Sequence, residues 1–517
     1  MNKEKFYITT PIYYVNGEPH IGSAYTTIAA DVLARFHRMK GEEVFFLTGT
    51  DEHGTKIAQA AQEQNITPQE FVDIISSKYQ MAWDVLDISN DDFIRTTSSK
   101  HKDLVKFFVT KLKEVGAIYE GEYEGLYCVG CEKFLTEKEL VNGECPDHKK
   151  RPELIKEKNY FFNLKKYLPE VEKRIDSGEI KILPEKIKKE VLGLFKQGLN
   201  DFSVTREKVK WGIEVPFDSS QVVYVWADAL LNYITALGYG SKDDLLFRKF
   251  WPANIHLMAK EIIKFHAIFW PAMLLAVGEE LPKTIFAHGF FTVDGQKMSK
   301  SLGNAIDPME LVKQFGSDAT RFLLLSQFPF GSDGDVKVGN FAIQYNSDLA
   351  NGIGNLTSRV LSMAEKYFPA NDGSHAKGGQ GASGGLVPER DSELAEPVKI
   401  IWQEFEKAME SFEVDKVIEA IKKLNGLCDS YVEDNKPWQL AKDDQEKLAK
   451  VIYNLLEALR HLGVMLYPVM PQASQKILES LGKGDFTSIK LSDLQNWGRL
   501  QSGTKVVKVD ALFPRMQ

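Results

Sequence analysis

Hydrophobic residues near the start of the chain change from strand spacing to helical spacing and back. A β-prone run covers Phe6 to Thr10, a loop follows at Pro11 to Pro19, and a buried strand is predicted at Val44 to Leu47. A helix that ends at Gly41 precedes that second strand, with apolar residues at helical intervals: Ile28, Val32, Phe36 and Met39. This order of strand, helix and strand predicts an α/β fold with a Rossmann-like parallel sheet and helices on its faces.

The pattern is interrupted after the first hundred or so residues. From Tyr119, short aromatic and charged segments replace the regular alternation. Strand and helix patterns return at Val222 to Trp226, Ile262 to Leu275 and Thr284 to Val293. We therefore predict one parallel-sheet domain that is split by an insertion.

The last third of the chain has helical periodicity. Beyond Asp348, one apolar stripe keeps a spacing of three or four residues: Leu349, Ile353, Leu356, Val360, Met363 and Tyr367. The stretch Asn371 to Gly385 is rich in Gly, Ser and Asn and is predicted to be a loop. We expect this region to form an all-α helix bundle.

Composition narrows the class of protein without identifying it. The 517 residues are 43% hydrophobic and 26% charged, as in a globular protein of several domains. The formal charge of −8 neither supports nor excludes a nucleic-acid partner, because locally basic surface can bind phosphate. The longest apolar run, Ile268 to Val277, is too short for a membrane span of about 20 residues, and the N-terminus has no secretory pattern. We expect a cytoplasmic protein without a membrane partner.

Three cysteines and one histidine form a closely spaced group. Cys128 and Cys131 have the same separation as Cys145 and His148, whereas Cys428 lies far away. This spacing predicts a tetrahedral Cys₃His site for one structural zinc ion, Zn²⁺. Four unconnected reduced side chains are the alternative.

Two short motifs predict a nucleotide site. His20, Gly22 and Ser23 stand where a strand gives way to a helix, so backbone N–H groups and a ring donor can face an anion. A turn histidine would give the same pattern. Lys297 and Lys300 belong to the sequence KMSKS, whose ammonium groups can neutralise charge on a departing pyrophosphate. A solvated run of charges is the alternative for that segment.

The two motifs, HIGS and KMSKS, resemble the signatures of class I aminoacyl-tRNA synthetases. Five segments are similar to those of methionyl-tRNA synthetases, in the same order: TTPIYYVNGEPHIG, FLTGTDEHGTKI, YVWADALLNY, FHAIFWPAML and HGFFTVDGQKMSKSLGN. The similarity extends through the C-terminal helices and covers nearly the whole chain. It implies a ligase that converts L-methionine and ATP to methionyl adenylate and pyrophosphate, with Mg²⁺ accompanying the ATP. Methionine would then pass to the 3′ end of tRNA(Met), including initiator tRNA.

The resemblance also implies site residues. His20, Lys297 and Lys300 are expected to stabilise the triphosphate in the transition state, and Asp51 to bind the α-ammonium group of methionine. The methionine pocket is expected to comprise Tyr14, Asp51, Trp226, Ala229, Leu230, Tyr233, Ile262 and His266. The ATP site is expected to comprise His20, Gly22, Ser23, Ala259, Glu261, Lys297, Ser299 and Lys300.

Three positions of the nucleotide site can be compared with the family pattern. Ser23 stands where the family commonly has a second histidine, so it offers a hydroxyl in place of an imidazole. Ala259 and Glu261 stand where the family usually has glycine and an acidic residue facing the nucleotide ribose. We expect the change at Ser23 to affect the rate and not the type of reaction, and Ala259 to tighten the contact with the ribose.

The helical region contains candidate RNA-binding residues. Asn355 and Arg359 are four apart on a predicted helix, so they share one edge, which from its own pattern could be merely hydrated. The resemblance implies that this pair binds the CAU anticodon together with Trp438, which lies in a turn after Asn435 and Pro437.

The resemblance divides the chain into five parts. They are 1–117, the first half of the class I catalytic domain; 118–215, the connective insertion with the zinc knuckle; 216–293, the second half of the catalytic domain; 294–347, the KMSKS loop and stem-contact region; and 348–517, the helical anticodon-binding domain.

Other functions fit the sequence less well. Valine, isoleucine and leucine enzymes of the same class usually have a much larger editing insertion. A simple nucleotidyltransferase would need neither the C-terminal helices nor KMSKS. A non-catalytic tRNA-binding relative would be favoured by loss of His20, Asp51 or Lys300, which are all present. No additional tRNA-binding domain of the kind that dimerises some family members follows Leu512 to Pro514, so we expect a monomer.

Overall fold

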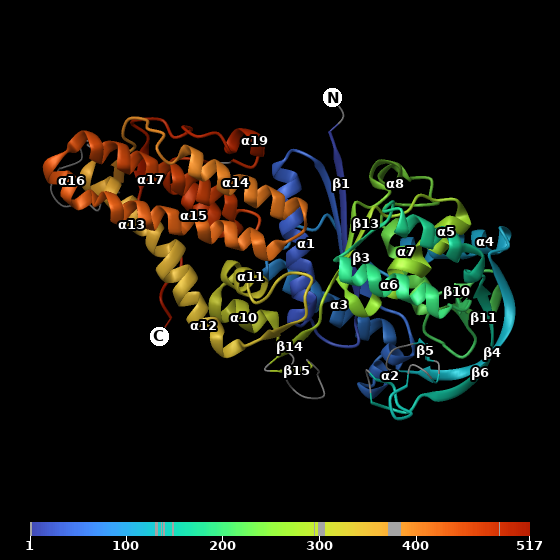
Figure 1. Ribbon diagram of the computed structural model, residues 1–517. Coiled ribbons are helices and arrows are strands. Elements are labelled where there is room, and N and C mark those ends of the chain that lie inside the picture. Colours follow the sequence, from blue (N-terminus) through green and yellow to red (C-terminus); the bar gives the residue numbers. More distant parts are fainter. Residues whose placement is uncertain are drawn as a thin grey trace.

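A computed structural model describes residues 3–129, 133–135, 137, 140–146, 149–293, 295–297, 306–370, 384–484 and 486–516. An α/β part built on a parallel sheet is joined to an elongated bundle of helices that extends to one side (Figure 1). Helix α1 (Ile21–Met39) lies between the two parts.

Six parallel strands form the central sheet, in the order β3-β2-β1-β12-β13-β7. They are β1 (Lys5–Tyr14), β2 (Glu43–Asp51), β3 (Asp92–Arg95), β7 (Lys181–Leu183), β12 (Ile255–Ala259) and β13 (Thr284–His288). Three of these strands precede the insertion and two follow it, so the predicted α/β fold with a split parallel sheet is confirmed. The strand order reverses between β1 and β12, and ligands of such folds bind at the carboxyl ends of the strands at this point.

Strand β1 separates two layers of side chains. Phe6 and Ile8 belong to one core cluster and Tyr7 to the other, as the alternation along a strand requires. The first layer contains α1 and α3 (Pro68–Val85). The second layer contains α4 (Ser99–Glu114), α7 (Val225–Thr235) and α9 (Trp270–Val277). Helices therefore cover both faces of the sheet, as in other all-parallel sheets.

The interval 118–215 forms a four-stranded antiparallel sheet, in the order β5-β4-β6-β8. The strands of this sheet are β4 (Ile118–Cys128), β5 (Lys133–Leu135), β6 (Glu153–Phe162) and β8 (Phe202–Ser203). The same interval contains the helices α5 (Leu164–Asp176) and α6 (Glu185–Gln197) and the short strands β9 (Thr205–Arg206) and β10 (Glu214–Val215) of another sheet. Between α5 and α6 the chain returns to the edge of the central sheet, where β7 pairs with β13. The sequence analysis includes that segment in the insertion, because three residues are too few to show a strand period.

Three elements after the insertion differ from the sequence prediction. The expected strand Val222 to Trp226 is the end of β11 (Asp218–Val223) followed by the start of α7. The expected helix Ile262 to Leu275 is not one regular α-helix. It consists of a 3-10 turn at Lys260–Ile262, a π-helix at Phe265–Phe269 and then α9. Aromatic and apolar residues dominate this stretch, so its composition does not distinguish the three helix types.

The expected strand Thr284 to Val293 is two strands, β13 and β14 (Phe291–Val293). They are separated at Gly289, which packs against the backbone of Ser332. A Cβ atom at Gly289 would lie 2.3 Å from the carbonyl carbon of Ser332, so only glycine allows this close approach.

The C-terminal region is the predicted helix bundle (Figure 1). Its helices are α13 (Asn355–Tyr367), α14 (Ala395–Glu410), α15 (Val414–Asn435), α16 (Pro437–Asp443), α17 (Gln445–Leu466) and α18 (Pro471–Ser480). Most of the predicted apolar stripe is buried, but its first residues belong to a π-helix at Tyr345–Gly354 that continues into α13. The expected loop Asn371 to Gly385 ends in strand β17 (Gly384–Leu386), which pairs with β18 (Lys505–Val507). Residues 371–383 lie outside the described residues.

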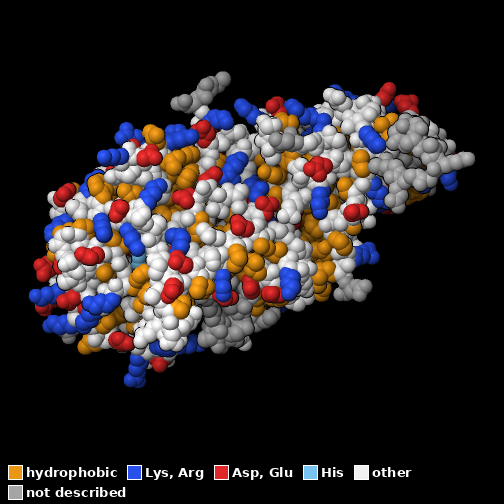
Figure 2. Space-filling view, turned by 180° about the vertical axis from the view of Figure 1, so that it is seen from behind, with side chains coloured by type: hydrophobic (Ala, Val, Ile, Leu, Met, Phe, Trp, Pro, Cys, Tyr) orange, Lys and Arg blue, Asp and Glu red, His pale blue; other side chains and the backbone are white. Residues whose placement is uncertain are grey.

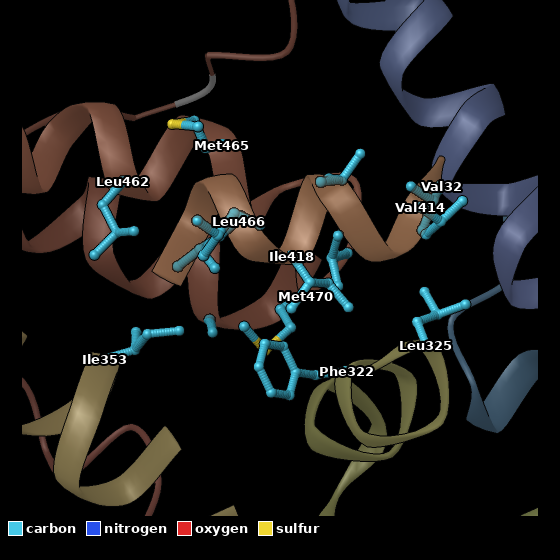
Figure 3. Packing of buried hydrophobic residues seen from close by; sticks show 14 of the residues in the cluster. Val32, Phe322, Leu325, Ile353, Val414, Ile418, Leu462, Met465, Leu466 and Met470 are labelled. Atoms are coloured by element: carbon cyan, nitrogen blue, oxygen red, sulfur yellow. The ribbon is translucent and has the colours of Figure 1, made fainter. Parts of the chain in front are cut away.

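The α/β part and the helix bundle share one hydrophobic core (Figure 3). Side chains from α1, α11 (Ser317–Leu325), α15 and α17 contribute to it: Val32, Phe322, Leu325, Val414, Ile418, Leu462 and Leu466. A continuous apolar core disfavours independent motion of two domains, because separation would expose this surface to water.

A buried guanidinium crosses the same junction. Arg321 of α11 donates to Asp31 Oδ2 of α1 (2.7 Å) and to the carbonyl of Leu86 (3.1 Å). It also donates to the carbonyls of Pro468 (2.9 Å) and Val469 (2.7 Å), which follow α17. One fully buried side chain thus joins α1 to the segment that follows α17 in the helix bundle.

Charged side chains of both signs are interspersed over the face seen from behind in Figure 2. Although the chain has a net charge of −8, acidic side chains do not form one continuous patch on that face. Within the described ranges, we find no helix that is both long enough and apolar enough to span a bilayer.

Candidate functional site

His20 caps the N-terminus of α1, beyond the carboxyl end of β1. Its Nδ1 atom accepts a hydrogen bond from the backbone N–H of Gly22 (3.1 Å), so a neutral His20 ring has its proton on Nε2. The Ser23 hydroxyl donates to the carbonyl of His20 (2.7 Å) and accepts from the His20 N–H (3.1 Å). Ser23 is buried and completes a reciprocal cap, which fixes the backbone of His20.

The first turn of α1 is also bonded to the segment that follows KMSKS. The N–H of Ile21 donates to the carbonyl of Ile306 (3.0 Å). This bond joins the residue after His20 to Ile306, the first described residue after the second motif. The Gly22 N–H, which was expected to face an anion, donates to His20 Nδ1 within the same turn.

Lys297 lies at the end of a hairpin formed by β14 and β15 (Gln296–Lys297). Asp335 supports the hairpin, because its Oδ1 atom accepts from the Gly295 N–H (2.8 Å) and from the Thr292 hydroxyl (2.7 Å). The predicted residues Ser299 and Lys300 lie outside the described residues.

A buried histidine connects α1 to the start of this hairpin. His288 Nδ1 donates to the carbonyl of Gly289 (2.9 Å), so Nε2 accepts from the hydroxyl of Thr26 on α1 (2.6 Å). Burial lowers the pKa of His288 to about 4, which keeps the ring neutral. The sequence analysis missed His288, because a single histidine at the end of an apolar strand is usual in a core.

The predicted methionine residues come from three segments. Tyr14 and Asp51 are paired at the carboxyl ends of β1 and β2. Trp226, Ala229, Leu230 and Tyr233 lie on α7, and Ile262 and His266 follow β12. The described contacts join the second and third segments to each other, and α7 to β1 through the Tyr7 hydroxyl, which donates to the carbonyl of Tyr233 (2.6 Å).

Tyr233 and His266 form a fixed polar pair in the predicted pocket. His266 Nδ1 faces the carbonyl of Ile262 (3.0 Å) and donates to it, so Nε2 accepts from the Tyr233 hydroxyl (2.7 Å). Burial lowers the pKa of His266 to about 4, so the ring is neutral at physiological pH. Next to His266, Phe265 stacks on Trp226 with ring centres 3.8 Å apart, which joins the aromatic walls of the two segments.

A second buried polar network supports Tyr233 from behind. His256 of β12 lies 4.2 Å from the Tyr233 ring, measured between ring centres. The Trp270 indole N–H donates to His256 Nε2 (3.3 Å), so Nδ1 donates to the Thr9 hydroxyl (2.7 Å). Burial lowers the pKa of His256 well below its ordinary value. Sequence reasoning missed Thr9, His256 and Trp270, which come from separate segments of the chain and give no sign of being bonded to each other.

Ala259 and Glu261 flank the carboxyl end of the central strand β12. Ala259 is the last residue of β12 and is partly buried. Glu261 is exposed in the 3-10 turn that follows. Both therefore lie at the strand end next to the point where the strand order reverses, which is where nucleotides bind in such folds.

Cys128 and Cys145 of the predicted zinc site are buried in one small cluster with Leu135. Thiols that are close together and shielded from water suit a zinc ion. Cys131 and His148 lie outside the described residues, among which there is no group of three or more side chains able to hold a metal ion.

The predicted RNA-binding residues meet on the surface of the helix bundle. Asn355 and Arg359 lie on α13, and Trp438 lies in the first turn of α16. The Arg359 guanidinium lies 5.7 Å from the centre of the Trp438 ring and donates to the Glu433 carboxylate (2.7 Å). Asn355 is exposed, and Trp438 keeps 41% of its surface accessible. Lys436, with φ 45°, makes the turn that brings α16 beside α13.

Comparisons with known proteins show what this chain is similar to. Residues 6–152 and 148–361 match the family model "tRNA synthetases class I (M)", and residues 382–517 match "Anticodon binding domain of methionyl tRNA ligase". A methionine–tRNA ligase of Caldanaerobacter subterraneus is 45% identical, over 99% of this chain and 79% of its own length. One of Streptomyces coelicolor is 42% identical, over 99% of this chain and 97% of its own length. The structure of Mycobacterium tuberculosis methionyl-tRNA synthetase in complex with methionyl-adenylate matches with a TM-score of 0.92 and 35% identity, covering 99% of this chain and 100% of that chain.

Proposed function

Because this chain belongs to the methionyl-tRNA synthetase family and catalyses the ligation of methionine to tRNA, we propose specific roles for the residues that converge around α1, α7 and the carboxyl ends of β1, β2 and β12. The reaction has two steps. The methionine carboxylate attacks the α-phosphate of ATP and releases pyrophosphate, and the terminal ribose of tRNA(Met) then takes the methionyl group from the adenylate.

Asp51 binds the α-ammonium group of methionine, since a carboxylate at a strand end gives a charge-assisted hydrogen bond to that group. Tyr14, Trp226 and Tyr233 surround the thioether, whose polarisable sulfur makes favourable contacts with aromatic rings. Ala229, Leu230 and Ile262 complete the apolar wall. His266 stays neutral and orients the Tyr233 hydroxyl, which supports a pocket without a cation beside the uncharged side chain of methionine.

His20, Lys297 and Lys300 stabilise the triphosphate as negative charge shifts towards the departing pyrophosphate. The proton on His20 Nε2 supports this role, because it makes the ring a hydrogen-bond donor on the side away from Gly22. Gly22, Ser23 and Ser299 shape the surrounding loops, and Ala259 and Glu261 face the nucleoside. Mg²⁺ accompanies ATP and neutralises part of its charge when bound.

Arg359, Asn355 and Trp438 bind the anticodon. An amide and a guanidinium can bond to base edges, and an exposed indole can stack on a base. Binding the anticodon here would select tRNA(Met) and initiator tRNA at the end of the bundle far from the adenylate.

Cys128, Cys131, Cys145 and His148 would hold one zinc ion, which would contribute structural stability to the insertion and no reaction step. The burial of Cys128 and Cys145 in one cluster supports this set of ligands. Metal analysis of the purified protein tests it, with one zinc per chain expected and less than half in Cys128→Ser/Cys145→Ser. Parallel sedimentation tests the expected monomer, and fractionation of cells tests the expected cytoplasmic location. The five domain boundaries remain predictions.

The observation that best supports the proposed catalytic roles is the bond between Ile21, next to His20 at the start of α1, and Ile306, the first described residue after the KMSKS motif. Exchange of labelled pyrophosphate into ATP, with each of the twenty amino acids and without tRNA, tests the assignment. Exchange that depends on L-methionine is expected; exchange with another amino acid, or none, would overturn it.

The same assay tests the catalytic residues. His20→Ala and Lys300→Ala should each slow methionine-dependent exchange by more than about tenfold, or about 1.4 kcal/mol of barrier. Lys313→Ala, an exposed lysine on α10 (Pro308–Phe315), is the matched control and should stay within about twofold. Unchanged rates in the first two variants would remove the roles assigned to them.

A further inference from the structure

Three buried titratable side chains form a continuous hydrogen-bonded row beside the methionine pocket, and none has a role in the reaction as described. Asp228 Oδ2 bonds to His53 Nδ1 and Asp228 Oδ1 bonds to His101 Nε2, each at 2.7 Å. His101 Nδ1 in turn bonds to the Thr235 hydroxyl at 2.7 Å. Asp228 is completely buried, and the two histidines are nearly so.

The protons in this row can be assigned. Burial opposes ionisation of Asp228, but the two histidines lower its pKa to about 2, so it is a carboxylate that can only accept. Both histidines therefore donate to it. His101 donates from Nε2 to Asp228 and is bonded through Nδ1 to the Thr235 hydroxyl, so its ring has a partner on both sides. Because both oxygens of the buried Asp228 carboxylate are hydrogen-bonded, its position relative to the two histidines is fixed.

The two ends of the His53–Asp228 bond belong to opposite sides of the pocket. Asp228 lies on α7 between Trp226 and Ala229, two of the residues proposed to surround the methionine side chain. His53 lies two positions after Asp51, the proposed anchor for the α-ammonium group. The bond therefore sets the distance between the anchor and the side-chain walls.

The residue between Asp51 and His53 is held as well. Arg95 Nε donates to Glu52 Oε1 (2.7 Å) and Arg95 Nη2 to Glu52 Oε2 (3.0 Å), a two-point contact. The Trp211 indole N–H donates to the Glu52 carbonyl (2.6 Å). Glu52 thus fixes the loop that follows β2 to β3. Among the hydrogen bonds described for Glu52 and His53, only the bond from His53 to Asp228 fixes this loop to α7.

We propose that Asp228, through its bond to His53, is a positioning residue for methionine. It holds the Asp51 carboxylate in register with the aromatic walls on α7, so that one substrate can meet both at once. This inference rests on the proposed function of Asp51. A purely structural network would instead affect folding and all substrates alike.

The chain offers a matched pair of variants to separate these roles. His53→Gln removes the bond on the Asp51 side, and His101→Gln removes the bond on the α4 side, where no proposed site residue lies. Each variant removes one histidine hydrogen bond to the Asp228 carboxylate, so similar losses of thermal stability are expected. In pyrophosphate exchange, His53→Gln and Asp228→Asn should raise the KM for methionine about tenfold, with the KM for ATP within about twofold, because one buried hydrogen bond is lost. His101→Gln should leave both KM values within about twofold.

Two inhibitors test whether the ammonium anchor is what moves. Methioninol keeps the amino group and 4-(methylthio)butanoate lacks it. Inhibition by methioninol should weaken in His53→Gln as much as the KM for methionine rises, while inhibition by the butanoate should not change. An equal rise in KM for His101→Gln, or equal weakening of both inhibitors, would assign the row to stability alone.

Asp51→Asn distinguishes failure of this inference from failure of the proposed function. If Asp51→Asn raises the KM for methionine and His53→Gln does not, only the positioning role fails. If Asp51→Asn leaves the KM unchanged, the proposed anchor itself is wrong, and the role of Asp228 falls with it.

Discussion

The proposed methionine pocket and the proposed anticodon surface lie in different parts of one molecule and are built in opposite ways. In the pocket, Tyr233 and His266 are 1% and 3% exposed, and their polar atoms are already bonded to each other or to the backbone. On the anticodon surface, Trp438 is 41% exposed, and Arg359 is paired with a Glu433 side chain that is itself 62% exposed. The Tyr233–His266 pair is therefore formed before a ligand arrives, whereas Arg359 would have to exchange its partner if RNA binds there.

The difference follows from the size of each ligand. Methionine is small, and one methylene in an apolar pocket changes binding by only about 1–3 kcal/mol, so discrimination requires groups that do not move. An anticodon brings phosphates, stacking bases and base edges, and each stacked base alone contributes about 1–3 kcal/mol. The surface can therefore tolerate a weak internal ion pair that RNA displaces.

The largest effect expected from this comparison is on the anticodon surface. Arg359→Ala should lower kcat/KM for tRNA aminoacylation about 100-fold, or about 2.7 kcal/mol, because a guanidinium contact to a base edge and to Trp438 is lost. Methionine-dependent pyrophosphate exchange should not change. Lys366→Ala on the same helix is the control. A comparable loss in that control, or a loss of exchange activity, would contradict a specific anticodon role.

The pocket should make the α/β part sensitive to acid in a way that the anticodon surface does not. The pKa of His266 is lowered to about 4 by burial, whereas an unfolded histidine titrates near about 6.5. Between these values the unfolded chain binds more protons, so the free energy of unfolding falls as the pH falls. From pH 7.5 to pH 5, His266 alone should account for about 2 kcal/mol.

Urea unfolding at pH 7.5 and pH 5, followed by tryptophan fluorescence, measures this loss. His266→Gln should show a shallower dependence on pH than the parent, although it is less stable at pH 7.5. Identical pH dependence in both proteins would show that His266 is not held neutral by the fold.

The next effect in size concerns the polar pair inside the pocket. Tyr233→Phe removes the donor to His266 Nε2 and leaves a buried acceptor without its partner, which costs about 1–3 kcal/mol. The KM for methionine in pyrophosphate exchange should rise about tenfold, and the KM for tRNA should stay the same. Tyr239→Phe is a control on the same face of the sheet, since its hydroxyl bonds to a lysine outside the pocket. A similar change in both variants would mean that the pocket is not organised by this pair.

The two regions also differ in how much of them the sequence predicts. The parallel sheet, α1 and the buried stripe of α13 follow from spacing, because strands and helices of that length repeat their pattern several times. The three-residue strand β7 and the π-helix at Phe265–Phe269 do not, since they are too short or too uniformly apolar to show a period. On the bundle, Asn355 and Arg359 share an edge that helical spacing places correctly.

Contacts between distant segments account for most of what was missed in the pocket. His53 and Asp228 are 175 positions apart, and Thr9 and His256 are 247 apart. Each residue in isolation resembles an ordinary core residue, and only the folded chain shows that their hydrogen bonds are mutual. Ser23 is an instructive local case. The sequence marks it as a departure from the family, and the structure explains how a hydroxyl can still cap α1.

The smallest effect should come from the ion pair that the RNA has to displace. Glu433→Gln removes the charge that holds Arg359 in the free protein, and exposed pairs of this kind are worth about 0.2–1 kcal/mol. The KM for tRNA should therefore fall by up to about fivefold, because less of the binding energy is spent on breaking the pair. Glu404→Gln, which breaks the similar pair with Lys423 elsewhere on the bundle, should leave that KM unchanged. A rise in the KM for Glu433→Gln would mean that Glu433 orients Arg359 for the anticodon, and the surface would then be organised in advance, as the pocket is.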